Sequence, residues 1–186
     1  MVIGFPNAFW SVLFVIALVG DLVLSGLWVK VYFTRGLPIF RRSFDADPPH
    51  RQPPPINELQ PALKSNVIHS LAMHALSQYE YAFRPTLIQL RVFDYTPTMH
   101  GLLRFDLNQR KVVVIGHANW LLILLTAMSV FIFISSSELW VWAFFGGGYT
   151  LIVGSLYLMD WRRYMRIGEL AARRWTARRF GLPTDA

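Results

Sequence analysis

The stretch that decides the fold is a double apolar run: ANWLLILLTAMSVFIFI at residues 118–134 and LWVWAFFGGGYTLIVGSLYLM at residues 139–159. Neither run contains a charged residue, and the polar segment from Ser135 to Glu138 separates them. Each run approaches the roughly 20 residues that a helix needs to cross a bilayer core of about 30 Å. The pattern predicts a hairpin of two transmembrane helices, at residues 118–135 and 139–159.

A third apolar run lies near the start of the chain, from Ala8 to Val29. It is too long for the apolar part of a secretory signal peptide, no Lys or Arg precedes it, and Asp21 interrupts it. We therefore expect a retained first transmembrane helix at residues 8–33, after a short external N-terminus at residues 1–7.

The basic residues predict an orientation. Eleven of the 18 Lys and Arg residues lie in residues 30–117, and the other seven lie in residues 160–186. Three spans would leave these two segments on one side, and the positive-inside rule places that side in the cytoplasm. The expected localisation is thus a multi-pass protein of the cell membrane, with the N-terminus outside and the C-terminus in the cytoplasm.

Composition agrees with a membrane protein, because 54% of the residues are hydrophobic and only 16% are charged, against roughly a quarter charged in ordinary globular domains. The absence of cysteine excludes thiol chemistry, disulfides and Cys-ligated zinc. The net charge of +7 would suit nucleic acid, an acidic partner or an anionic membrane. Since the predicted topology accounts for the arginines, we expect anionic lipid headgroups as partners and no nucleic acid.

Between the first and second spans, the sequence predicts a spacer and a small folded unit. Residues 34–56 form the spacer, because five prolines between Asp45 and Pro55 favour an extended chain. Residues 57–117 form the unit, which begins with a helix that Asn57 can cap. Apolar residues at near four-residue spacing extend this expected helix to about Tyr79.

After Tyr81 the pattern changes to strands, expected at residues 86–95, 101–107 and 110–116. Asn108-Gln109 is the expected turn of a hairpin. The predicted fold class is therefore an α-helical membrane protein, with three transmembrane helices and a small cytoplasmic α+β unit inserted between helices 1 and 2.

Residues 160–186 predict a basic, amphipathic cytoplasmic tail. Trp161 and Trp175 share one helical stripe, and the arginines lie away from it. Such a helix could lie on the membrane with its arginines at lipid phosphates, or pack its apolar stripe on the α+β unit. The residues predicted to contact lipid or a partner are Trp161, Trp175, Arg162, Arg166, Arg173 and Arg178.

Asp21 is the one charged residue inside a predicted span. A carboxylate at this depth must face protein, water or a cation. It could bind a proton or cation, but an interhelical hydrogen bond is the favoured hypothesis. Its candidate partners are Ser25, Thr126, Ser129, Tyr149, Thr150 and Ser155.

Small residues allow helices to approach each other closely. The glycines expected to allow such packing are Gly20, Gly26, Gly147 and Gly154.

Patterns typical of catalysis are weak. The spacing of His69 and His74 is poor for a shared metal ion on one helix face. His100 and His117 border expected strands and could lie near each other. There is no phosphate-binding Gly-Lys-Ser/Thr loop and no Gly-x-Ser-x-Gly motif. We therefore predict no catalytic residue, no metal and no cofactor.

The function expected from the sequence is that of a non-enzymatic accessory or scaffolding subunit of a membrane assembly. Its transmembrane helices would dock on other membrane subunits or on a second copy. Its cytoplasmic unit and basic tail would bind a partner or anionic lipid. The alternatives are a transporter or channel component that uses Asp21, and a membrane-bound enzyme with a site at the cytoplasmic membrane face.

Overall fold

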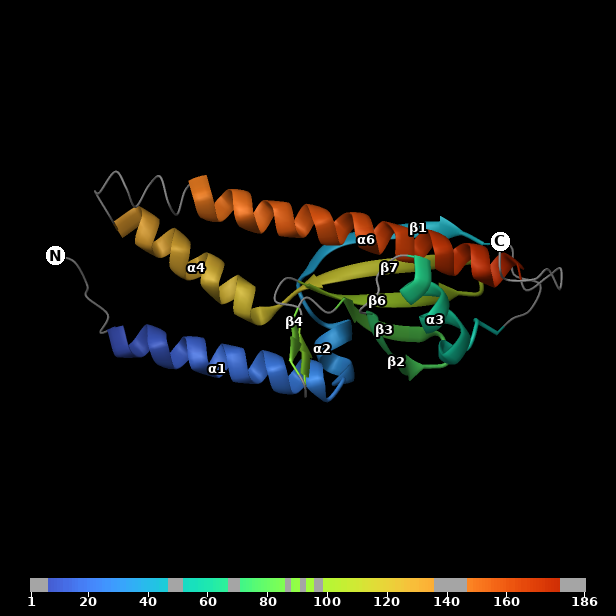
Figure 1. Ribbon diagram of the computed structural model, residues 1–186, viewed down its shortest axis with the longest axis horizontal. Helices are drawn as coiled ribbons and strands as arrows, with labels where there is room; N and C mark the ends of the chain where they lie inside the picture. Colours follow the sequence, from blue (N-terminus) through green and yellow to red (C-terminus); the bar gives the residue numbers. More distant parts are fainter. Residues whose placement is uncertain are drawn as a thin grey trace.

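The computed structural model describes residues 7–46, 52–66, 71–85, 88–90, 93–95, 99–135 and 147–177. Within these ranges, five antiparallel strands form a sheet with the order β1-β7-β6-β3-β2 (Figure 1). They are β1 (Pro38–Asp45), β2 (Leu71–Ser77), β3 (Glu80–Pro85), β6 (Met99–Asp106) and β7 (Lys111–Ala118). A separate two-stranded ribbon pairs β4 (Ile88–Leu90) with β5 (Phe93–Tyr95).

The hairpin of β6 and β7 confirms the two strands and the turn that the sequence predicts. The strands pair from Asp106 opposite Lys111 to Met99 opposite Ala118. In the turn, Asp106 Oδ1 accepts hydrogen bonds from the backbone N–H groups of Asn108 and Gln109, each at 3.0 Å. This local side-chain contact replaces ladder bonds at the point where the chain reverses.

The described helices are α1 (Asn7–Gly26), α2 (Lys30–Thr34), α3 (Ile56–Asn66), α4 (Trp120–Ser135) and α6 (Thr150–Ala177). The second half of α6 and α3 cover one face of the sheet (Figure 1). α1, α4 and the first half of α6 extend beyond the end of the sheet (Figure 1). We call this part of the molecule the helical end.

The two faces of the sheet carry different hydrophobic clusters, as the alternation of side chains in a strand requires. On β3, Tyr81 and Phe83 belong to the main core, which α3 and α6 complete. Ala82, between them, packs with Tyr32 and Phe33 of α2 on the other face. α2 therefore covers part of the face opposite α3 and α6.

The second half of α6 lies in the main core. Tyr164 is fully buried, and its hydroxyl donates to the Met99 carbonyl at 3.0 Å. Trp175 is 1% exposed and donates from Nε1 to the Gln52 carbonyl at 3.2 Å. At Gly168, a Cβ atom would collide with the side chains of Phe44 and Val114. Glycine at this position therefore allows α6 to lie close to β1 and β7.

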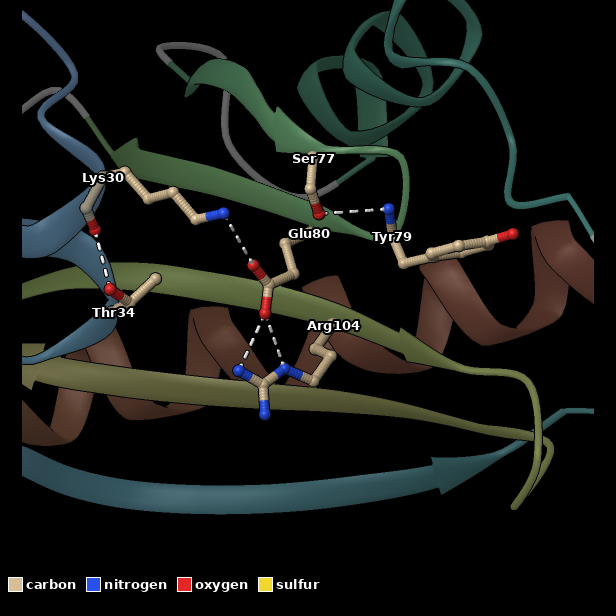
Figure 2. A network of polar contacts seen from close by, with 6 residues as sticks. All are labelled: Lys30, Thr34, Ser77, Tyr79, Glu80 and Arg104. Atoms are coloured by element: carbon tan, nitrogen blue, oxygen red, sulfur yellow. Dashed lines mark hydrogen bonds and ion pairs between the residues drawn. The ribbon is translucent and has the colours of Figure 1, made fainter.

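Figure 2 shows how α2 is held against the outer side of β3 and β6. The Glu80 carboxylate lies 2.8 Å from Arg104 Nη2 and accepts a second bond from Arg104 Nε at 2.9 Å. Lys30 Nζ lies 4.0 Å from the other carboxylate oxygen (Figure 2). Because both basic side chains are largely exposed, water screens these pairs, and they contribute about 1 kcal/mol or less each.

The structure contradicts the predicted membrane fold. Among the residues it describes, no helix is both long enough and apolar enough to cross a membrane. The prediction of three transmembrane helices is therefore wrong, and the fold is α+β. The multi-pass localisation in the cell membrane, and the orientation derived from it, are wrong for the same reason.

The physical cause lies in where the helices end and what they contact. α4 has 16 residues, which extend about 24 Å and fall short of a core of about 30 Å. In α1, Asp21 and Ser25 are buried against protein. α6 continues past Met159 into the sheet domain, and residues 139–146 of its expected span lie outside the described residues.

Two further expectations differ from the structure. The helix expected to reach Tyr79 ends at Asn66, and Leu71–Ser77 forms β2. Leu71 and Met73 are buried on alternate positions of this strand, so pairing with β3 decides its conformation.

Residues 38–45, expected as part of the spacer, form edge strand β1, because Phe40 and Phe44 pack against the main core.

Two glycines of α6 provide a matched test of this packing. We expect Gly154→Ala to raise the free energy of unfolding by up to about 1 kcal/mol, because alanine is the better helix former and the described structure has open space there. We expect Gly168→Ala to lower it by about 1–3 kcal/mol, because the added methyl group overpacks the contact with β1 and β7. Urea denaturation measures both, and equal effects would contradict the described packing.

Candidate functional site

A buried polar cluster joins the helical end to the sheet. It consists of Asp21 from α1, Tyr32 from α2, His100 from β6, His117 from β7 and Asn119 before α4. Each of these side chains is at most 5% exposed. Buried polar groups are costly unless they are hydrogen-bonded, so their contacts determine what the cluster can do.

Hydrogen bonds link four members of this cluster in a chain. The Tyr32 hydroxyl donates to Asp21 Oδ1 at 2.5 Å and lies 3.4 Å from the Asn119 side-chain amide. His100 Nδ1 lies 2.8 Å from the same amide. His100 Nε2 lies 3.1 Å from the Tyr32 backbone carbonyl. The chain thus connects α1 and α2 to β6 and α4.

Burial lowers the pKa of His100 to about 4, although its hydrogen bonds to Asn119 and Tyr32 oppose this shift. The imidazole is therefore neutral near pH 7 and has a single N–H group. Each of its ring nitrogens faces an oxygen atom, Nδ1 the Asn119 Oδ1 and Nε2 the Tyr32 carbonyl oxygen. A neutral ring therefore donates to one of these two oxygens.

His117 lies opposite His100 across the β6–β7 pair, and the two rings stack with centroids 5.5 Å apart. Burial and the nearby His100 lower the pKa of His117 to about 4. Its Nδ1 is buried and has no hydrogen-bond partner among the described residues. A Cβ at Gly36 would lie 2.9 Å from the His117 Cβ, so the backbone after α2 closes over this ring.

The end of α1 is held by a second set of contacts. Arg84 Nη1 donates to Ser25 Oγ at 2.6 Å, and its guanidinium lies 4.6 Å from the Trp28 ring centroid. Trp28 also stacks on Phe33 and His74. Its φ of 53° is uncommon for a bulky residue. Trp28 thus occupies the left-handed position that follows a helix, where glycine is usual.

The chemistry of the buried polar cluster favours a structural role. Its histidines are neutral, and its carboxylate is paired with a tyrosine. In the part of the chain that the structure describes, no three His, Asp or Glu side chains gather as a metal site. The chain of bonds joins His100 to Asp21, as the enzyme alternative requires, but these side chains are 2% and 1% exposed.

Asp21 is thus hydrogen-bonded within the protein, as the favoured hypothesis expects, but to a different partner. Tyr32 is absent from the candidate partners of Asp21, because one continuous helix is expected at residues 8–33. The chain instead reverses near Trp28, which brings Tyr32 back beside Asp21. His100 and His117 do lie together. Asn119 is 87 residues from Tyr32, and no local pattern in the sequence predicts that contact.

Arginines form a second candidate site on the outward side of α6. Arg162 and Arg166 are exposed, and the described residues give them no ion pair. Arg163 pairs with the buried carboxylate of Asp160 at 3.4 Å. These three arginines, with Ser155, Leu158 and Met159, line a shallow cavity of about 320 Å³. We call this feature the α6 hollow.

The other predicted contact residues differ in their surroundings. Trp161 is 36% exposed, and Arg173 is exposed and paired with Glu169 at 2.6 Å. Trp175 is part of the main core, so the tail packs its apolar stripe on the sheet. Arg178 lies outside the described residues.

The predicted packing glycines have open surroundings. A Cβ built on Gly20, Gly147 or Gly154 would meet no described atom within 4 Å. Gly26 is the last residue of α1. Within the described residues, no helix therefore packs closely against Gly20, Gly147 or Gly154.

Exposed apolar side chains cover much of the helical end. On α1 they form one continuous stripe, Val12, Val15, Ile16, Val19 and Val23, and Leu27 follows just after the helix. α4 contributes Trp120, Val130 and Phe131, and α6 contributes Leu151, Ile152 and Leu158. Contiguous apolar surface of this kind is rare unless it contacts a partner or a membrane.

Comparison with protein-family models, with curated proteins and with solved structures finds no match for this chain.

Removing the Tyr32 hydroxyl should show what its hydrogen bond to Asp21 contributes to stability. We expect Tyr32→Phe to lower the free energy of unfolding by about 2–3 kcal/mol, because a buried carboxyl group then loses this hydrogen bond. Tyr81→Phe, which removes a hydroxyl bound to the Pro54 carbonyl, should cost about 1 kcal/mol. Denaturant unfolding compares the two, and a smaller loss for Tyr32→Phe would argue against the described network.

Stability should also fall in mild acid. His100 and His117 have folded-state pKa values of about 4, below the usual 6.5. The unfolded chain therefore binds more protons between pH 6.5 and pH 4, and the free energy of unfolding decreases as pH falls through this window.

Thermal unfolding between pH 7 and pH 4 measures this slope. The double variant His100→Asn/His117→Asn should have a shallower slope than the wild-type chain, whereas His74→Asn, at an exposed position, should retain it. An unchanged slope in the double variant would show that other groups cause the acid sensitivity.

Proposed function

We propose that this protein is a non-enzymatic accessory protein that binds an anionic lipid surface from one side. The observation that carries the proposal is the outward face of α6, which changes from apolar to basic within about one turn. Leu158, 48% exposed, belongs to the apolar part. Arg162 and Arg166, at positions i+4 and i+8 on the same side, begin the basic part.

α1 also exposes apolar side chains at the helical end. Its exposed stripe extends to Val23, and Leu27, just after the helix, is 73% exposed. α1 contains no basic residue, so of these two helices only α6 changes from apolar to basic. α1 contacts α4, which lies between α1 and α6 in Figure 1.

This pairing of surfaces suits the headgroup region of an anionic lipid surface. Apolar side chains there enter the boundary of the acyl chains, and arginines bind phosphates. Each basic residue near such a surface contributes about 1 kcal/mol. A second copy of the chain fits less well, because a symmetric contact would bring the same unpaired arginines together.

The proposed attachment is peripheral. It is compatible with the described helices, none of which is long and apolar enough to cross a bilayer. The buried polar cluster supports the proposal indirectly, because it fixes the orientation of α1 and α4 relative to the sheet. The alternative of a proton or cation site at Asp21 gains no support from a carboxylate that is 1% exposed and bound to Tyr32.

Vesicle co-sedimentation tests the proposal. The full chain should bind phosphatidylcholine vesicles that contain phosphatidylglycerol more tightly than pure phosphatidylcholine vesicles, and added salt should weaken the difference. Arg162→Glu/Arg166→Glu should reduce binding to the anionic vesicles at least about tenfold.

The charge-matched control is Lys64→Glu/Lys111→Glu, which changes two cations at the far end of the sheet domain. It should bind nearly as the wild-type chain does. Equal binding to both kinds of vesicle, or equal losses in the two double variants, would overturn the proposal. A stoichiometric homodimer without vesicle binding would assign the apolar surface to protein contacts instead.

A further inference from the structure

We infer that the α6 hollow is a binding site for one phosphate-bearing amphiphile, with its headgroup at the arginines and its apolar portion toward Leu158 and Met159. This inference rests on the proposed lipid-binding function and specifies the ligand. The chemical class is a lipid with a phosphomonoester headgroup. Binding at the α6 hollow differs from the general attraction of a basic surface to a bilayer, because it requires one ligand per protein chain.

The basic end of the hollow matches a phosphate group. Arg162 and Arg166 are four residues apart on one helix, so their Cβ atoms lie about 5–6 Å apart. Both side chains are exposed and have no ion pair with a described residue. Two guanidinium groups at this spacing can converge on one phosphate through charge-assisted hydrogen bonds. A phosphomonoester offers three acceptor oxygens and up to two negative charges.

Arg163 completes the basic end. Its Nη1 lies 3.4 Å from Oδ1 of Asp160, which is 2% exposed. This buried carboxylate limits the directions that the Arg163 side chain can take. The guanidinium group has five N–H donors, and Asp160 does not occupy all of them at this single contact. Arg163 is thus a positioned cation beside two exposed ones.

The other end of the hollow has the opposite character. Leu158 is 48% exposed, and Met159 and Ser155 also line the cavity. From Ser155 to Arg166 the helix rises about 16 Å. The serine hydroxyl can bind ester or glycerol oxygens, while Leu158 and Met159 provide an apolar surface. A volume of about 320 Å³ is at the small end of ligand sites and suits a headgroup with the start of its chains.

The hollow also lies where the proposed surface contact places headgroups. It spans the boundary between the apolar and basic parts of α6, so an amphiphile bound there has the same polarity direction as lipids in the adjoining layer. This agreement of direction favours a lipid over a free phosphate ion. Inorganic phosphate would use only the arginine end.

Dihexanoyl phosphatidic acid, kept below its micelle concentration, is the probe for the test. Isothermal titration of the full chain should show binding at a ratio of one to one. Glycerol 3-phosphate and inorganic phosphate should bind at least about tenfold more weakly, because they lack the apolar portion. Arg162→Gln/Arg166→Gln should weaken binding of the lipid probe about tenfold or more.

Arg173→Gln is the matched control, since Arg173 lies on the same helix outside the hollow and pairs with Glu169. It should leave binding of the lipid probe unchanged. Equal binding of all three probes would overturn the lipid assignment, and an equal loss in Arg173→Gln would overturn the location.

The vesicle experiment separates this inference from the proposed function. Vesicle binding without one-to-one binding of dihexanoyl phosphatidic acid overturns the specific site and leaves the peripheral function standing. Absence of both kinds of binding overturns both.

Discussion

The hydrogen bond from Tyr32 to the buried carboxylate of Asp21 is the constraint on which the arrangement of the helical end depends. The hydrogen bond from Arg84 of β3 to Ser25 and the reversal at Trp28 also join α1 to the sheet domain. The same tyrosine lies beside Asn119, which begins α4, and its backbone carbonyl meets His100 of β6. Tyr32 thus contacts α1, β6 and the residue before α4. Its bond to Asp21 matters because burying a carboxylate without a partner costs several kcal/mol.

α6 connects this helical end to the core by a different physical principle. Its second half is held by close packing, with Gly168 against Phe44 and Val114 and with Trp175 in the core. Its first half exposes Leu151 and Ile152. Because one helix is rigid over both parts, the core fixes where the exposed surface and the α6 hollow lie. A binding surface supported by rigid elements loses little conformational entropy when it engages a partner.

Buried polar groups and exposed binding groups therefore lie in different parts of the molecule. Neutral histidines, a paired carboxylate and stacked aromatic rings occupy the junction, where water is excluded. Arg162 and Arg166, which form no ion pair with a described residue, lie with apolar side chains on the outside. This division suits the proposed binding role, because the exposed side chains of the α6 hollow are of the kinds that attract anions and apolar surfaces.

The sequence by itself determined the β6–β7 hairpin, a helix near Asn57, and the exposure of Arg162 and Arg166, because alternation, apolar spacing and charge are local properties. The predicted cap is wrong, because α3 begins at Ile56 and Asn57 lies inside it. It also indicated that Asp21 needs a partner. Only the tertiary structure decided that Tyr32 is that partner, that Leu71–Ser77 is a strand, and that Trp175 is a core residue. Hydropathy counts apolar residues along the chain, but it cannot show where a helix ends or which distant side chain satisfies a buried polar group. Those outcomes depend on contacts such as that between Tyr32 and Asn119, which are far apart in the sequence.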